Sequence, residues 1–310
     1  MRNTLLKNIS QKLQTQEDII VLLGDLGTFQ MREASKIFPD RVINFGIMEQ
    51  SMIGFASGLA KGGFYPITYS ITPFLVDRAY EQIKIDLIYN DNSVLILSAG
   101  ASFDYSNLGP TQHCPHDVSN LLSINHPYIV HPLTKLESIK ICDYLISHKQ
   151  QAYFRISTSE CELDNSKFKK VEELNLEKTS EKQTLFEKYQ SISKNKSKNK
   201  ILSVLFGPDS IFLGNYEQRI NSSGTLITVP IITQKSLKDL ALEIKNYEEI
   251  FLFIPYEPSS LISKLLTYLS YKNVSKPSFI KAIHPKNIFF DNSFNKELIL
   301  KHFSQETQIM

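Results

Sequence analysis

The stretch Asn44-Phe45-Gly46-Ile47-Met48-Glu49-Gln50 joins a short apolar strand, residues 41–45, to a tightly packed helix. Apolar residues recur at helical spacing after the turn at Gly46: Met48, Met52, Phe55 and Leu59. Small residues lie between them, so another backbone can approach closely, and Gly62 and Gly63 end the helix. Glu49 therefore begins a helix that is apolar nearly all round, and we expect its carboxylate to be buried or half buried.

Two interpretations of Glu49 follow from this position. Burial disfavours the charged form of a carboxyl group and raises its pKa toward values useful for proton exchange at neutral pH. A carboxylate in the first turn of a helix can also simply complement the helix dipole. The pattern alone leaves both open.

Composition limits the classes of function. The chain has 310 residues, enough for two domains, with 42% hydrophobic and 21% charged residues. A net charge of +2 gives no sign of nucleic-acid binding. The cysteines, Cys114, Cys142 and Cys161, have no metal-ligand spacing and suit a reducing cytoplasm. No apolar run approaches the roughly 20 residues that span a bilayer, and no secretory segment is evident at the start, so we expect a cytoplasmic protein without membrane contact.

Strands and helices alternate in the first half of the chain. Continuous apolar runs such as 19–23 indicate strands covered on both faces. Further strands are predicted at 41–45, 65–69, 94–97, 128–130 and 153–156, and helices at 2–14, 49–61, 75–89 and 135–147. This alternation predicts an α/β fold with a doubly wound, mainly parallel sheet over residues 1–158.

The rest of the chain divides into two parts. Residues 159–200 are rich in Lys, Glu, Ser and Asn, and predict a linker or surface excursion rather than a nucleic-acid patch, because acids balance much of the base. Residues 201–310 predict a second, smaller α/β domain with strands at 201–206, 225–229 and 250–254 and helices near 235–246 and 258–271. No cluster of charged residues or histidines there indicates chemistry.

Candidate functional residues follow the strand ends, where ligands bind in open parallel sheets. Asp25, Glu49 and Phe74 come after the first three strands, His131 follows a later one, and Arg155 lies in the last. A long loop, 99–115, carries His113 and leads to His116. Connections of this length are usually functional. The two histidines are candidates for proton transfer or for hydrogen bonds to an oxygenated substrate, with structural roles equally open.

These motifs together resemble the C-terminal half of transketolase-type thiamine-diphosphate enzymes, that is, the pyrimidine-binding domain followed by the C-terminal domain. The matching stretches are Phe38-Pro39-Asp40-Arg41 before Gly46-Ile47-Met48-Glu49-Gln50, Pro73-Phe74-Leu75 before Arg78-Ala79-Tyr80-Glu81-Gln82-Ile83, and Leu108-Gly109-Pro110-Thr111 before His113. The resemblance is specific over residues 2–155 and weaker from residue 201 onward.

The resemblance implies roles for individual residues. Glu49 matches the catalytic glutamate that hydrogen-bonds N1′ of the aminopyrimidine and so promotes proton loss at thiazolium C2. Phe74 matches the aromatic residue that stacks on the pyrimidine, and Asp25 an acid near the cofactor across the subunit interface. Arg155 and Arg78 match arginines that bind a substrate phosphate, a task suited to the paired donors of a guanidinium. The alternative for Arg78 is an ion pair with Glu81 on one helix face.

The sequence departs from the family pattern in two ways. The amino-terminal domain that holds Mg²⁺ and the diphosphate through Gly-Asp-Gly has no match here, since Gly24-Asp25-Leu26-Gly27 is not that motif. The resemblance therefore implies that an alpha subunit supplies it, in an α2β2 assembly, and that this chain ligates no metal itself. Gln112 stands where transketolases usually have histidine, with His113 after it, and Gly100 replaces another expected substrate histidine.

The leading hypothesis is thus a beta subunit of a two-component, thiamine-diphosphate-dependent enzyme that transfers a two-carbon ketol unit between carbonyl compounds such as sugars or sugar phosphates. In it, Glu49 and His113 are catalytic, Asp25 and Phe74 bind cofactor, and Gln112, Arg78 and Arg155 bind substrate. One alternative is a subunit that decarboxylates 2-oxo acids, either in a dehydrogenase or as a deoxyxylulose-phosphate-synthase-like enzyme. The other is a degenerate regulatory subunit, and the sequence does not reveal the substrates or the pathway.

Overall fold

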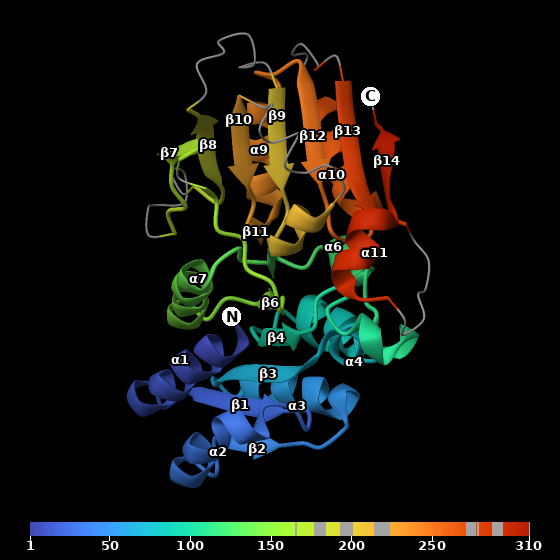
Figure 1. The fold of residues 1–310 in the computed structure, drawn as a ribbon. Coiled ribbons are helices and arrows are strands. Elements are labelled where there is room, and N and C mark those ends of the chain that lie inside the picture. Colours follow the sequence, from blue (N-terminus) through green and yellow to red (C-terminus); the bar gives the residue numbers. More distant parts are fainter. Residues whose placement is uncertain are drawn as a thin grey trace.

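The chain folds into two α/β domains, each built on one sheet (Figure 1). This computed structural model describes residues 1–164, 166–176, 184–192, 201–213, 224–270, 277, 279–286 and 294–309. Within these residues each sheet has seven strands, in the orders β11-β5-β6-β4-β3-β1-β2 and β14-β13-β12-β9-β10-β8-β7. The predicted α/β class with two domains is confirmed, although the second sheet has as many strands as the first.

The first sheet is parallel except for one short edge strand. Its strands are β1 (Ile19–Leu23), β2 (Val42–Asn44), β3 (Tyr65–Ile71), β4 (Leu95–Ala99), β5 (Tyr128–Val130), β6 (Ala152–Ile156) and β11 (Ile231–Ile232). Every strand predicted in the first half is present, with ends shifted by at most a few residues. The edge strand β11 comes from the second half of the chain and pairs antiparallel with β5.

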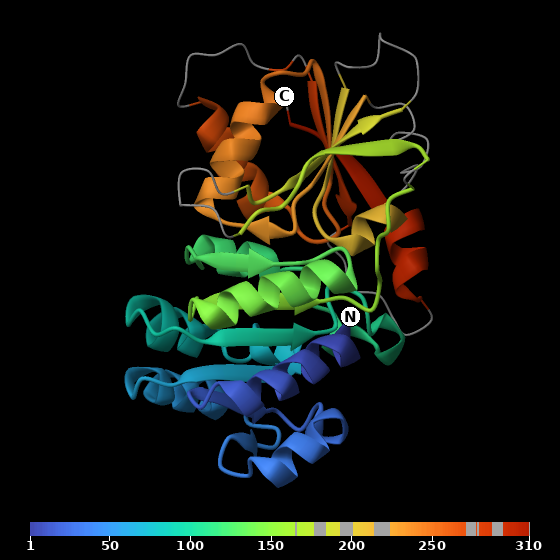
Figure 2. The ribbon, with the colours of Figure 1, turned by 90° about the vertical axis from the view of Figure 1, so that its left-hand side faces the viewer.

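Two hydrophobic clusters cover the two faces of this sheet. Successive residues of β1 alternate between them: Ile20 and Leu22 belong to one, and Ile19, Val21 and Leu23 to the other. Helices α1 (Arg2–Thr15) and α7 (Lys135–Ser147) lie side by side on one face (Figure 2). The long apolar runs of the sequence are thus strands buried on both sides, as predicted.

Helices α2 (Thr28–Ile37), α3 (Glu49–Lys61) and α6 (Asp117–Ser123) complete this domain, together with a broken helical segment. The prediction of one continuous helix over 75–89 is wrong. The chain forms two short helices, α4 (Thr72–Leu75) and α5 (Tyr80–Gln82), and then a π-helix, Ile83–Tyr89. The amide of Arg78 donates a hydrogen bond to the carbonyl of Pro73, five residues earlier. This bond closes a wide turn that interrupts the regular helix and turns Arg78 toward the sheet edge.

The second sheet has a parallel centre and antiparallel edges. Its parallel strands are β9 (Ile201–Leu205), β10 (Thr225–Thr228), β12 (Glu249–Phe253) and β13 (Phe279–Pro285), and its helices are α9 (Gln234–Ile244), α10 (Ser259–Ser270) and α11 (Lys296–His302). Strand β14 (Ser304–Gln308) forms one edge. Part of the predicted linker belongs to this sheet: β7 (Phe168–Glu172) and β8 (Glu187–Ser191) form its other edge.

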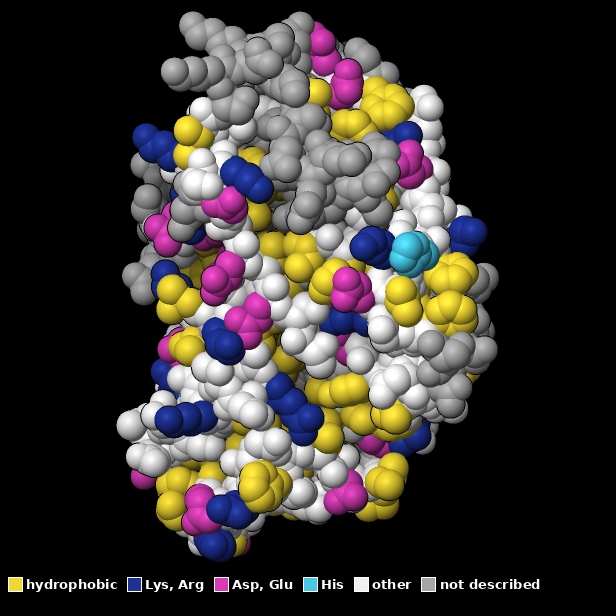
Figure 3. Space-filling view, viewed as in Figure 1, with side chains coloured by type: hydrophobic (Ala, Val, Ile, Leu, Met, Phe, Trp, Pro, Cys, Tyr) yellow, Lys and Arg dark blue, Asp and Glu magenta, His cyan; other side chains and the backbone are white. Residues whose placement is uncertain are grey.

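The two domains share a core. The cluster that holds Ile20 and Met52 continues through Leu202 and Leu240 of the second domain, and β11 extends the first sheet. On the face shown in Figure 3, Lys and Arg are interspersed with Asp and Glu over the described surface, in keeping with the near-neutral charge. No helix of the described residues is long and apolar enough to cross a membrane.

Candidate active site

Glu49 lies at the carboxyl edge of the first sheet, where the strand ends predicted a site. It is the first residue of α3, and only 1% of it is exposed. Its Oε1 accepts a hydrogen bond of 2.8 Å from Ser70 Oγ, at the end of β3. Gly24, at the end of β1, packs against this pair so closely that a Cβ there would lie 2.9 Å from Ser70 Oγ. The carboxylate is therefore enclosed and held in one orientation.

The second oxygen of Glu49 is paired with Arg78. Arg78 Nη1 lies 2.6 Å from Glu49 Oε2, and the Arg78 guanidinium lies 4.4 Å from the centre of the Phe74 ring. Glu49 and Phe74 thus contact the same guanidinium. A carboxylate and an aromatic ring placed in this way could also contact one ligand. The pairing of Arg78 with Glu81 that the sequence suggested is replaced by this longer-range contact.

Arg78 is the movable member of this group. Its side chain is 38% exposed, whereas Glu49 is enclosed. Since an exposed guanidinium loses little by returning to water, Arg78 can leave Glu49 Oε2 for an incoming ligand.

Asp25 lies at the same edge but points to a different partner. It has a left-handed backbone (φ 54°), and its carboxylate accepts a hydrogen bond of 3.1 Å from Asn44 Nδ2. Asn44 Oδ1 in turn accepts from the amides of Asp25 and Gly46. Asn44 therefore joins the ends of β1 and β2 and leaves Asp25 exposed to solvent or to another chain.

The long loop between β4 and α6 is compact rather than structureless. Two short 3₁₀ helices, Ser106–Leu108 and Pro110–Gln112, fold within it, and Ser102 bridges to Cys114 across its base. His113 is buried, with its ring edge-on to Phe103 at 5.4 Å. Burial lowers the pKa of His113, against an opposing hydrogen bond with the backbone at Ser106, so the imidazole is neutral at pH 7. Gln112 is half-buried beside it.

Gly100 explains one departure of this loop from the transketolase pattern. Its φ is +83°, and a Cβ at this position would overlap the Tyr105 ring. A histidine cannot occupy this backbone unless Tyr105 moves away. The loop is therefore built around glycine and tyrosine at the place where the resemblance implies a substrate histidine.

Replacing Gly100 with alanine is expected to lower the free energy of unfolding by about 2 to 4 kcal/mol, because backbone strain and overpacking add together. Gly63→Ala is the matched control, since Gly63 has a similar φ of +91° but nothing lies within 4 Å of the place that a Cβ would take. That variant should lose only the strain, about 1 kcal/mol. Urea unfolding followed by circular dichroism compares the two, and equal losses would show that Tyr105 does not restrict the position.

Arg155 is buried at the boundary with the second domain. It is 1% exposed, its Nε lies 2.6 Å from Asp117 Oδ2, and its Nη2 donates to Ser102 Oγ. Its guanidinium lies 5.2 Å from the centre of the Tyr256 ring in the second domain. Two donors of Arg155, Nε and Nη2, are thus directed at protein groups, and its role in binding a substrate phosphate stays a prediction.

His131 is a structural neighbour of this buried group. It is 1% exposed and packs between Gly207 and Tyr256 of the second domain. Burial, together with the nearby Arg155 charge, lowers the pKa of His131 to about 3. A neutral, enclosed imidazole cannot reach a substrate, so this strand-end histidine helps to hold the domains together.

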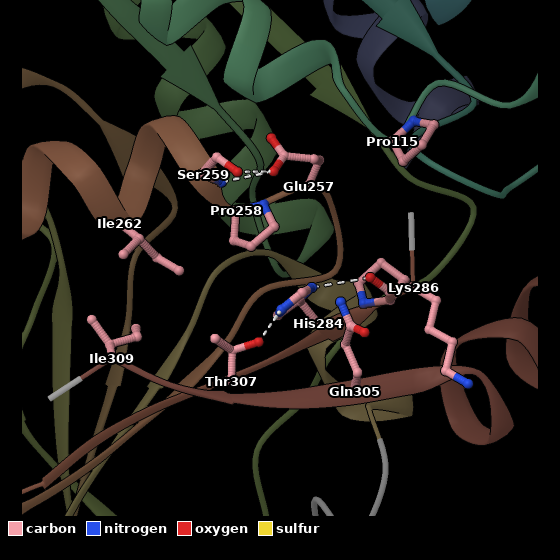
Figure 4. Close-up of a pocket in the computed structure, with 11 residues that line it drawn as sticks. Pro115, Glu257, Pro258, Ser259, Ile262, His284, Lys286, Gln305, Thr307 and Ile309 are labelled. Atoms are coloured by element: carbon pink, nitrogen blue, oxygen red, sulfur yellow. Dashed lines mark hydrogen bonds between the residues drawn. The ribbon is translucent and has the colours of Figure 1, made fainter. Parts of the chain in front are cut away.

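A cavity of about 400 Å³ lies elsewhere on the domain boundary, between Pro115 and the second domain (Figure 4). His284 bonds across it to Thr307 Oγ1 at 3.1 Å, and Lys286 extends away from its centre. Neither Glu49 nor Phe74 lines it. The buried carboxylate, rather than this cavity, therefore indicates the sheet edge as the candidate site.

Sequence reasoning missed two partners of the predicted residues. Ser70 follows the predicted strand 65–69 directly, a signal that could have marked it as a neighbour of Glu49. Asp117 gave no such signal, because its contact with Arg155 spans 38 residues. The described residues contain no group of three or more His, Cys, Asp or Glu that could hold a metal ion.

The buried carboxylate, which shares one guanidinium with an aromatic ring, lies at the carboxyl edge of a parallel sheet, the edge at which open α/β sheets bind small molecules. Residues 1–162 match the family model described as transketolase, pyrimidine binding domain. The chain belongs to this family.

Curated relatives match about half of the chain. It is 31% identical over 161 residues to the B subunit of an apulose-4-phosphate transketolase from Actinobacillus succinogenes, a match that covers 52% of each chain. It is 26% identical over 157 residues to a 6-deoxy-6-sulfo-D-fructose transketolase subunit from a Clostridium species, covering 50% of this chain and 49% of that protein. The chain thus spans about half the length of the curated relatives it matches.

Solved structures share the whole fold. A split-gene transketolase, described as an inactive beta4 tetramer, superposes with a TM-score of 0.72 at 16% identity and covers 97% of this chain and 92% of that one. Transketolase from Campylobacter jejuni superposes with a TM-score of 0.64 at 13% identity, covering 96% of this chain and 43% of that one. These likenesses confirm the arrangement of two α/β domains.

Proposed function

We propose that this chain is the beta subunit of a two-component, thiamine-diphosphate-dependent enzyme that transfers a two-carbon ketol unit between carbonyl compounds. The observation that carries the proposal is the enclosed Glu49 carboxylate, held by Ser70 and sharing the Arg78 guanidinium with the Phe74 ring. Membership of the pyrimidine-binding family and relatives named as transketolase subunits support it.

The residues present fit the pyrimidine end of the cofactor. Glu49 would accept a hydrogen bond from a protonated ring nitrogen, and Phe74 would stack on the ring once Arg78 turns toward solvent. Bound thiamine diphosphate supplies a carbon nucleophile for the ketose carbonyl. The chain's own part is to orient the ring, to hold a proton at the Glu49 carboxylate, and to place the neutral His113 in the loop that borders this edge.

A second chain would complete the site. Ile47, Met48 and Phe55, which flank Glu49, are exposed, at 70%, 55% and 46%. Apolar side chains clustered around a functional residue are typical of a surface that another protein covers. In the proposed α2β2 assembly, the alpha subunit supplies the residues that hold Mg²⁺ and the diphosphate, and Asp25 faces the interface.

Reconstitution tests the proposal. The chain is expressed alone and together with a partner that carries the Gly-Asp-Gly segment, and ketol transfer from a ketose to an aldehyde is measured with thiamine diphosphate and Mg²⁺. We expect transfer only from the two-chain complex. Carbon dioxide release from pyruvate without ketol transfer would indicate 2-oxo acid decarboxylation instead. A complex that binds no thiamine diphosphate would indicate a regulatory subunit.

A further inference from the structure

Hydrogen bonds and an ion pair join the loop 99–115 to the second domain, both near the start of the loop and at its end. They are a hydrogen bond of 2.7 Å from Ser102 Oγ to the carbonyl of Pro255, one of 2.8 Å from the amide of Glu257 to the carbonyl of Pro115, and an ion pair between Asp104 and Lys296. The loop that carries His113 is therefore fastened to a domain in which the sequence indicated no chemistry.

Lys296 begins helix α11, which lies at the boundary between the two domains (Figure 1). Its side chain is 11% exposed. A cation in the first turn of a helix is unfavourable with respect to the helix dipole, so other groups must stabilise it there. Side-chain oxygens surround its ammonium group: Asp104 Oδ1, Asp209 Oδ1 at 3.0 Å, Ser157 Oγ at 3.3 Å, Thr158 Oγ1 at 2.9 Å and Ser159 Oγ at 2.6 Å.

Two buried carboxylates share the charge of Lys296. The side chains of Asp104 and Asp209 are both 0% exposed, and both accept from the same ammonium group. Burial acts to lower the pKa of Lys296, but the two carboxylates raise it above its ordinary value, so the ammonium group is charged. Burial and the Asp209 carboxylate raise the pKa of Asp104, whereas Lys296 acts to lower it. Asp104 therefore depends on Lys296 to remain a carboxylate.

Asp104 in turn fixes the first turn of the loop. Its Oδ2 accepts hydrogen bonds from the amides of Ala101, at 2.9 Å, and Thr158, at 3.0 Å. Its Oδ1 accepts one of 2.8 Å from Thr158 Oγ1. A carboxylate accepts such bonds more strongly than an uncharged group does. Asp104 thus closes the turn 101–104 and ties it to the segment after β6, and both effects are strongest while Lys296 keeps it charged.

The same loop reaches the candidate active site. Its 3₁₀ helix Pro110–Gln112 packs against α4, which carries Phe74. The ring of His113 lies edge-on to the ring of Phe103, the residue before Asp104, at 5.4 Å. A shift of Asp104 is therefore expected to move Phe103 and, with it, His113.

We propose that Lys296 is a positioning residue of the second domain, which acts through Asp104 to hold the loop 99–115 against the candidate active site. Gln112 and His113 are thereby placed to contact the substrate, a role that rests on the proposed function. The hold on the loop itself does not depend on that function. The second domain thus takes part in the reaction through a loop of the first.

Hydrogen exchange on the full chain tests the hold on the loop without cofactor or partner. In Lys296→Met, amide exchange over residues 100–115 should become about 10- to 100-fold faster than in the wild type, the effect of losing one hydrogen bond to a charged group. Exchange over β1, residues 19–23, should stay unchanged, which separates local opening from global unfolding. Lys301→Met is the matched control, because Lys301 is exposed on the same helix, and it should exchange as the wild type does.

Asp104→Asn is the second variant, for use if Lys296→Met does not fold. It keeps the volume of the side chain and leaves Lys296 paired with Asp209. It should accelerate exchange over residues 100–115, since an amide oxygen accepts more weakly than a carboxylate. Exchange at the wild-type rate over these residues, in a folded Lys296→Met chain or in Asp104→Asn, overturns the proposal.

Kinetics of the two-chain complex test the effect on the substrate. Lys296→Met should raise the KM for the ketose by about 10- to 100-fold, the scale of a misplaced group. The dissociation constant of thiamine diphosphate should keep its wild-type value, because Glu49 and Phe74 lie outside the loop. A general loss of folded protein would instead lower the apparent kcat and leave KM unchanged.

The outcomes of these experiments are distinguishable. Faster exchange over the loop together with a wild-type KM overturns the positioning role and leaves the proposed function intact. A wild-type complex without ketol transfer overturns the proposed function, and with it the role of Lys296 in placing groups for the substrate.

Discussion

Replacing Glu49 with glutamine in the two-chain complex is expected to lower the turnover of ketol transfer by about 10²- to 10⁴-fold, the range for a group that holds a proton in catalysis. Glutamine keeps the volume of the side chain, and its carbonyl oxygen can still accept from Ser70. It cannot carry a negative charge or take up a proton at neutral pH. The effect should therefore fall on kcat, while the chain stays folded.

Two measurements separate catalysis from folding in this variant. Steady-state kinetics at saturating cofactor give kcat and KM, and urea unfolding of the isolated chain should move by no more than about 1 kcal/mol, because the lost partner, Arg78, is partly exposed. Glu81→Gln is the control, since Glu81 is exposed near the same edge. Wild-type turnover by the Glu49 variant would refute the proposed function.

The sequence predicted the parts of the fold that depend on local pattern. Continuous apolar runs such as 19–23 mark strands covered on both faces, and helical periodicity marked 135–147 with both ends correct. Strand β7 was not predicted, because only Phe168 of its five residues is buried. Edge strands need no apolar alternation and often carry charge, so the charged pair Lys169 and Lys170 favoured the prediction of a linker. Strand β11 has two residues, too few to form a pattern.

The residues of the candidate site also divide into those that the local sequence pattern predicts and those that it does not. Glu49, Asp25 and Phe74 follow strands directly, so their common edge follows from topology alone. The partners of the two arginines do not, because each pair joins elements far apart in the chain: Arg78 with Glu49, and Arg155 with Asp117. Motif resemblance gave both arginines the same task, whereas burial separates them. Arg78 is exposed enough to exchange partners, and Arg155 is enclosed.

Because Arg155 is buried, its replacement is expected to cause a large loss of stability. Arg155→Met should lower the free energy of unfolding by about 3 to 5 kcal/mol, because it leaves a buried carboxylate without its cation. Asp117 is 0% exposed, and its remaining side-chain contact is the Tyr153 hydroxyl, 2.7 Å from Oδ2. Burial acts to lower the pKa of Arg155, but the nearby Asp117 carboxylate and Tyr153 hydroxyl raise it above its ordinary value, so the guanidinium is charged.

The double variant Asp117→Leu with Arg155→Met identifies the cause. If the penalty comes from an unpaired buried charge, removing both charges should cost less than Arg155→Met alone, since an apolar pair of similar volume needs no compensation. Arg32→Met is the exposed control: its pair with Glu33, at 3.3 Å, is 59% and 67% exposed and should contribute at most about 1 kcal/mol. Urea unfolding followed by circular dichroism ranks the variants. A single variant as stable as the Arg32 control would mean that Arg155 is free to serve a substrate after all.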